Sequence, residues 1–145
     1  MTEELKKLLD HAVEYATELL TETGESYPFG AYIDLKGNTH PLEMEIDPKN
    51  IPQIGKVIEN LTKYCTEEME QNRMRGYCLS YEVKIKLDEQ TTTDATAFEF
   101  HHCEEKDLPK FYLPYTMTKS TSAPDQDTGA TVTRTVKLGE LFAVK

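Results

Sequence analysis

Residues 77–87 alternate apolar and polar side chains without interruption, and this pattern constrains the fold more than any other feature. Tyr, Leu, Val and Ile occupy every second position, with Cys, Ser, Glu and Lys between them. A period of two places successive side chains on opposite faces of a strand. The run therefore predicts a long strand in a sheet with one covered face and one more polar face.

Other stretches can supply partner strands for this run. Residues 93–104 and 111–118 follow it after short turns, so the three form a predicted meander. Upstream, residues 29–35 and 40–46 flank the segment Lys-Gly-Asn at 36–38. Glycine and asparagine supply the positive φ that a tight turn requires, so this region predicts a hairpin.

Two segments have the periodicity of amphipathic helices. Apolar residues recur at helical spacing over 5–20 and again over 54–69. Thr2 is suited to cap the first helix and Gly24 to end it, while Gly76 is expected to end the second.

The end of the chain differs in composition. Residues 119–129 consist of turn-forming residues with no large apolar side chain and predict a mobile loop. Residues 130–145 form a strand-like tail that could join the sheet or pair with another chain.

The order of these elements predicts the fold class. It reads α-β-β-α-β-β-β plus the tail, with short connections throughout. We expect a single α+β domain over 1–145, with a largely antiparallel sheet of about five or six strands and two amphipathic helices.

Two resemblances follow from these patterns. Tyr27-Pro28-Phe29-Gly30-Ala31 resembles the helix–"PFG"–strand opening of a group of small uncharacterised bacterial proteins, which implies no activity. The element order is similar to that of roadblock and profilin-like scaffolds, which implies a five-stranded antiparallel sheet between helical layers. Pro114 departs from that class, because proline prefers an edge or a bulge where the class has an interior strand.

Charge and cysteine content bound the location and the partners. With 16 Lys and Arg against 26 Asp and Glu the net charge is -10, which argues against nucleic acid and anionic membranes as partners. The first helix has an acidic exterior, whereas residues 119–145 are slightly positive. Cys65, Cys78 and Cys103 have no CxxC spacing, and no segment reads as a leader or a membrane span. We therefore expect a cytoplasmic protein with reduced thiols.

Candidate ligand or nucleophile side chains gather at one place, the segment His101-His102-Cys103. On a strand His101 and Cys103 share one face and His102 lies on the other, so no more than two adjacent ligands converge. A metal site, a Cys103–His101 dyad and a purely structural role all remain open. No catalytic residue, cofactor or metal is assigned.

Two functions from different classes follow. The first is a non-enzymatic binding or regulatory protein that engages another polypeptide, itself or a basic protein through its acidic helix, sheet face or tail. The second is a small ligand-binding domain or enzyme. Its pocket would lie beside Tyr27, Phe29 and Gly30 and would use the histidines or Cys103. The absence of any catalytic motif favours the first function.

Overall fold

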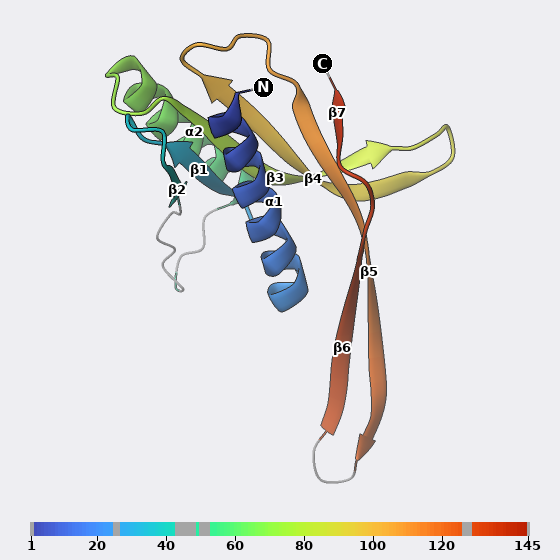
Figure 1. Cartoon of the computed structure of the whole chain (residues 1–145). Coiled ribbons are helices and arrows are strands. Elements are labelled where there is room, and N and C mark those ends of the chain that lie inside the picture. Colours follow the sequence, from blue (N-terminus) through green and yellow to red (C-terminus); the bar gives the residue numbers. More distant parts are fainter. Residues whose placement is uncertain (1, 25–26, 43–48, 50–52, 126–128, 145) are drawn as a thin grey trace.

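The computed structural model describes residues 2–24, 27–42, 49, 53–125 and 129–144. Its elements in chain order are α1 (Glu3–Thr23), β1 (Phe29–Ile33), β2 (Thr39–Leu42), α2 (Ile54–Glu70), β3 (Gly76–Lys86), β4 (Thr92–His102), β5 (Lys110–Asp125), β6 (Gly129–Leu138) and β7 (Phe142–Val144). The strands form one seven-stranded sheet in the order β2-β1-β3-β4-β5-β6, with β7 beside β5 (Figure 1). Every pairing is antiparallel, so the predicted α+β class is confirmed.

Helix α1 begins and ends where its capping residues predict. The Thr2 hydroxyl accepts a hydrogen bond from the Leu5 amide, and Gly24 adopts a left-handed φ of 75° while its amide donates to Leu20. One stripe of the helix is fully buried: Leu5, Leu8, Ala12, Ala16 and Leu20. Each buried leucine stabilises the packing by roughly 1.5–3 kcal/mol relative to an exposed one.

Helix α2 ends earlier than the sequence predicts. Its last residue is Glu70 and Gln71 is its C-cap, whereas Gly76 is the first residue of β3. The close approach of the neighbouring strand explains why residue 76 is a glycine. A Cβ there would lie 2.7 Å from the carbonyl oxygen of His101 on the neighbouring strand. Gly76 is therefore required for close strand pairing and not to stop the helix.

The two helices pack against opposite faces of the sheet. Ala31 of β1 and Cys78 of β3 are paired and lie in the core cluster under α1. Their neighbours Tyr32 and Tyr77 are also paired and belong to the cluster under α2. Both faces of β3 are thus covered over residues 76–80, which corrects the expectation of one more polar face there. Over residues 81–86 half-buried and exposed side chains alternate, as expected.

The β1–β2 hairpin forms around the predicted turn. Gly37 has a φ of 88°, as a tight turn requires. The Asp34 carboxylate accepts hydrogen bonds from the Lys36 and Asn38 amides at 2.8 and 2.9 Å and also contacts His40. The His40 contact and these amides lower the pKa of Asp34 to about 2. Strand β2 ends at Leu42, and the predicted residues 43–46 lie outside the described part of the chain.

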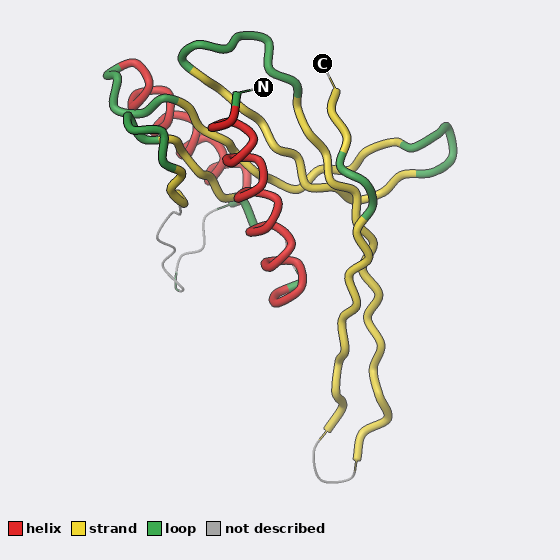
Figure 2. The backbone as a smooth tube through the Cα atoms, in the orientation of Figure 1, coloured by secondary structure: helices red, strands yellow, loops and turns green. Residues whose placement is uncertain are grey.

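Strands β5 and β6 extend far beyond the rest of the sheet as a two-stranded ribbon (Figures 1 and 2). Strand β4 pairs with β5 only as far as Tyr115, whereas β6 pairs with β5 from Tyr115 to Asp125. We call residues 116–125 and 129–138 the arm. The sequence predicts a loop over 119–129, but the structure has strand up to Asp125 and again from Gly129, with 126–128 outside the described residues. The Thr and Ser residues here fit a strand and do not act as turn formers.

Pro114 lies where β5 changes partners. Strand β7 pairs with β5 up to Tyr112, and β6 pairs with it from Tyr115. The Pro114 carbonyl accepts a hydrogen bond from the Gly139 amide at 2.8 Å, so its nitrogen faces the same side. The missing amide proton therefore costs the β4–β5 ladder no hydrogen bond. This interior position is compatible with proline because the neighbouring strand changes at this point.

In the described residues, none of the helices is both long and apolar enough to cross a membrane.

Two glycines provide a matched stability test. We expect Gly76→Ala to lower the free energy of unfolding by about 1–3 kcal/mol, because the new Cβ would clash with backbone. We expect Gly55→Ala, in the exposed first turn of α2 with nothing within 4 Å, to raise it by about 0.5–1 kcal/mol. Urea unfolding measures both. Equal effects of the two substitutions would contradict the packing described at Gly76.

Candidate functional site

The residues of the PFG motif lie in the core and at a strand pairing. Phe29 is buried under α1 with its ring 4.5 Å from that of Tyr15. Gly30 lies between β2 and β3, where a Cβ would be 3.3 Å from the Cys78 carbonyl oxygen. Tyr27 packs against the cluster under α2, and its buried hydroxyl has no hydrogen-bond partner among the described residues.

These residues do not share a pocket with the histidine segment. Strand β3 separates β1 from β4, which carries His101 and His102. A cleft beside α2 includes both histidines in its lining but not Phe29, Gly30 or Cys103. The structure thus separates the two halves of the pocket that the sequence suggests.

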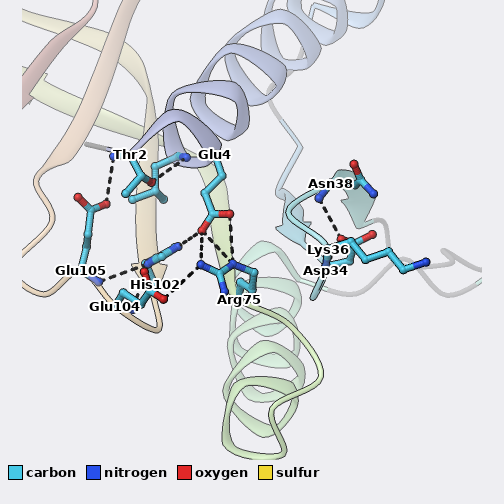
Figure 3. Close-up of polar contacts among 10 residues, drawn as sticks. Thr2, Glu4, Asp34, Lys36, Asn38, Arg75, His102, Glu104 and Glu105 are labelled. Atoms are coloured by element: carbon cyan, nitrogen blue, oxygen red, sulfur yellow. Dashed lines mark hydrogen bonds and ion pairs between the residues drawn. The ribbon is translucent and has the colours of Figure 1, made fainter.

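His102 belongs to a polar cluster that holds the start of α1 against the sheet (Figure 3). Its side chain is fully buried, and its Nε2 contacts Glu4 Oε1 at 2.5 Å. The same carboxylate receives the Arg75 guanidinium, with Nε at 3.0 Å and a terminal nitrogen at 3.0 Å. Three elements, α1, the α2–β3 connection and the end of β4, therefore meet at Glu4.

The remaining hydrogen bonds of His102 define its tautomer. Its Nδ1 accepts from the backbone amides of Glu104 and Glu105 at 3.1 and 3.3 Å. Since Nδ1 is an acceptor, the proton is on Nε2 and is donated to Glu4. Both ring nitrogens are used by the fold, so this histidine has a structural role.

Charge also stabilises the ionised form of Glu4. The hydrogen bond from Arg75, followed by the one from His102, holds the pKa of the Glu4 carboxyl below its ordinary value, although partial burial opposes the shift. Arg75 also contacts Glu104 at 3.4 Å, and its backbone carbonyl accepts from the Cys103 amide. The cluster thereby extends into the β4–β5 connection.

His101 lies on the opposite face of β4, in a cleft of about 610 Å³ beside α2. We call this the α2 cleft. Its lining comes from α2, the sheet and the β4–β5 connection: Thr62, Thr66, Met69, Glu70, Tyr77, Glu99, Phe100, His101, His102 and residues 105–110. The imidazole of His101 stacks on the Tyr77 ring with centroids 4.7 Å apart, and its Nε2 is 3.3 Å from Glu99.

Glu99 connects His101 to two further side chains. Its second oxygen accepts a hydrogen bond from the Tyr81 hydroxyl at 3.3 Å, and Tyr81 in turn interacts with Lys110. His101 is the main reason that the pKa of Glu99 is lowered, and the Lys110 charge acts in the same direction. A carboxylate that orients an imidazole in this way leaves Nδ1 able to accept a proton or a hydrogen bond.

The cysteines do not form a reactive site with these groups. Cys65 and Cys78 are buried, and burial raises the pKa of the Cys65 thiol to about 12. Cys103 is exposed beyond the end of β4 and does not line the α2 cleft. Within the described ranges, no group of three or more His, Cys, Asp or Glu side chains is placed to hold a metal ion.

The sequence alone predicts one contact of this site, the one between Glu99 and His101. Glu99 and His101 are two residues apart on a strand, so the period of two already places them on one face. Tyr77 and Lys110 could not be found in this way. The contact of Tyr77 with His101 depends on the β3–β4 register, and Lys110 follows a connection whose path no pattern specifies.

No family model, curated protein or solved structure matches this chain. Its functional interpretation therefore depends on the geometry of the cleft, the cluster and the arm.

The Glu4 cluster predicts a pH-dependent contribution to stability. We expect Glu4→Gln to lower the free energy of unfolding by about 1–3 kcal/mol at neutral pH, because it removes the charge paired with Arg75. The folded pKa of Glu4 is depressed, so its stabilisation is complete above the ordinary pKa and is lost as pH falls through the folded value. Urea unfolding across acid pH measures this, with exposed Glu3→Gln as control. A difference from wild type that does not shrink on acidification would contradict the assignment.

The two hydrogen-bonding roles of His102 can be separated. His102→Asn keeps an acceptor near the Nδ1 position, whereas His102→Gln keeps a donor toward Glu4 and loses that acceptor. We expect the Glu104 and Glu105 amides to stay more protected from hydrogen exchange in the Asn variant than in the Gln variant. Amide exchange followed by NMR measures the difference. Equal protection in both variants would mean that Nδ1 does not hold this segment.

Proposed function

We propose that the protein is a non-enzymatic interaction domain that binds another polypeptide by strand addition along the arm, and that this polypeptide is a second copy of the chain. The single observation that carries the proposal is the pairing of the arm. In the part of the chain that the structure describes, residues 116–125 of β5 pair only with β6, and β6 pairs only with β5. Both outer edges of the ribbon are therefore without a partner strand in the described structure.

Unprotected edges of this length favour pairing with another chain. A row of free backbone donors and acceptors is a template for strand addition, and proteins normally shorten or cover such edges. An isolated two-stranded ribbon is also marginal in water, because it has no third layer to bury its side chains. A further strand supplies the missing hydrogen bonds.

The register identifies which backbone groups face outward on β6. The Gly139 amide donates toward β5, and alternate residues of a strand point the same way. The amides of Thr135 and Lys137 therefore face β5, whereas those of Arg134 and Val136 face the open edge. Two β6 edges can pair in antiparallel fashion about a twofold axis, so one surface serves both copies.

Exposed apolar side chains concentrate at the base of the arm. Among the side chains that the structure describes, exposed large hydrophobic residues lie on the β3–β4 turn, at the end of β6 and in and next to β7: Leu87, Leu138, Leu141, Phe142 and Val144. Apolar side chains gathered beside an open edge are typical of a surface that is covered in an assembly.

Charge complementarity also favours a second copy. Residues 119–145 carry four basic and three acidic side chains, so their net charge is +1 and residues 1–118 carry -11. Antiparallel pairing along β6, about 34 Å for its 10 residues, brings the tip of one arm beside the base of the other. The slightly basic segment 119–145, which includes most of the arm, then lies near the acidic body of its partner, which favours encounter.

The cytoplasmic location and the likeness to a known scaffold are proposed from the cysteines and from the layers of the fold. The three cysteines are free, and two of them are buried, which supports a reducing cytoplasmic environment. Helices on opposite faces of an antiparallel sheet support the likeness to roadblock and profilin-like scaffolds. The absence of a catalytic constellation in the sequence supports a binding role.

The oligomeric state tests the proposal. Light scattering over a concentration series should give twice the monomer mass for wild type. We expect Val136→Pro to shift the protein toward monomer, because it removes an outward amide without removing a β5–β6 hydrogen bond. Val136→Thr keeps that amide and is the matched control, with circular dichroism to verify folding of both. A wild type that stays monomeric throughout, or a Val136→Pro variant that dimerises as well as Val136→Thr, overturns the proposal.

A further inference from the structure

We propose that the α2 cleft is a binding site for a protonated primary amine carried on an apolar body, with His101 as its central acceptor. This inference is independent of the arm, because the cleft lies beside α2 and the β4–β5 connection and contains no residue of the arm. It would stand whether or not two copies of the chain associate.

The size and lining of the cleft suit a small organic ligand. Its volume of about 610 Å³ falls within the range of about 300–1,000 Å³ that is usual for ligand pockets. Met69, Leu108 and Pro109 supply apolar surface from both walls. Polar groups converge from the sheet between them, which is the typical division of roles in such sites.

Comparison of the two adjacent histidines shows why His101 is the functional one. His102 is fully buried and both of its nitrogens are hydrogen-bonded within the fold. His101 is oriented by stacking on Tyr77 and by Glu99, and 47% of its side chain is exposed. Only its Nε2 has a partner in the described structure. An ordered ring with one unused nitrogen in a cleft is suited to bind a ligand.

The neighbours of His101 determine which kind of ligand group it prefers. Glu99 is held in its ionised form, mainly by the hydrogen bond with His101. An ionised Glu99 favours the tautomer with the proton on Nε2, so Nδ1 of the neutral ring is an acceptor. In this tautomer the ring pairs with a ligand atom that is a hydrogen-bond donor, as an ammonium group is.

The charges around the cleft favour a cation over an anion. Glu70, Glu99 and Asp107 in the lining are opposed by Lys106 and Lys110, while the carboxylate of Glu105 accepts a hydrogen bond from the Thr2 amide at the start of α1. Lys110 interacts with Tyr81 and lies near Glu99, so these two charges offset each other within the fold and leave Glu70 and Asp107 against Lys106. A carboxylate ligand would meet net negative charge, whereas an ammonium group would be attracted.

An ammonium group on an apolar body can come from a free amine or from a polypeptide. A free amine such as phenethylamine presents an ammonium on an aromatic body, and a lysine side chain of a polypeptide presents it on an aliphatic one. The two sources are distinguished by comparing phenethylamine with N-acetyl-lysine methylamide as probes. The tighter of the two identifies the source.

NMR titration of the full chain tests the inference. Phenethylamine should cause saturable shifts at the amides of Thr66, His101 and Leu108, and phenylacetate, an anion of similar shape, should not. N-acetyl-lysine methylamide is titrated in parallel. Failure of both amines to shift these amides, or equal binding of phenylacetate, overturns the inference without bearing on the arm.

A matched pair of variants locates the acceptor. His101→Gln keeps a donor toward Glu99 and removes the Nδ1 acceptor, so we expect amine binding to weaken about tenfold. His11→Gln, on α1 and thus on the other face of the sheet, should bind like wild type. Unchanged affinity in His101→Gln would contradict the role of His101. If that variant fails to fold, the comparison of phenethylamine with phenylacetate on the wild-type protein still tests whether the cleft prefers an amine.

Discussion

The pairing of β3 with β4 is the contact on which the rest of the structure depends. It runs without a break from Gly76 opposite His102 to Lys86 opposite Thr92. Strand β1 attaches to one side of this pair and β5 to the other, while each helix packs on one of its faces. Because side chains alternate along both strands, the register of this ladder decides which residue meets which helix. A slip of one residue would exchange the two cores.

The Glu4 cluster and the α2 cleft each contain one of two adjacent residues at the end of β4. His102 points toward α1 and joins Glu4 and Arg75, whereas His101 points toward α2 and stacks on Tyr77. His102 thus fixes α1 to the sheet. His101 is oriented by Tyr77 and Glu99, and its Nδ1 has no partner among the described residues. The same segment, residues 103–110, touches both environments. The Glu4 cluster on one face and the α2 cleft on the other are thereby connected through a short piece of backbone.

Local patterns were sufficient to predict the elements but not their long-range contacts. The caps at Thr2 and Gly24, the turn at Gly37 and the long strand all follow from rules that act within a few residues. The packing of a helix on each face of the sheet could not be predicted in this way, because the periodicity of one strand does not show which elements pack against it. The Glu4–His102 contact joins residues 98 apart in the chain, which no local rule can supply. The arm was misread because threonine and serine serve turns and strands alike.

The exchange of neighbours at Pro114 separates the chain into a body and a part of adjustable length. Within the described residues, β5 beyond Tyr115 pairs only with β6, so residues added in matched numbers to both strands near the tip lengthen the arm by about 3.4 Å each. Adding two on each side preserves which side chains face which way, whereas an unmatched addition forces a bulge. The length of the arm can therefore change without any change in the β3–β4 register that positions the core, the cluster and the cleft.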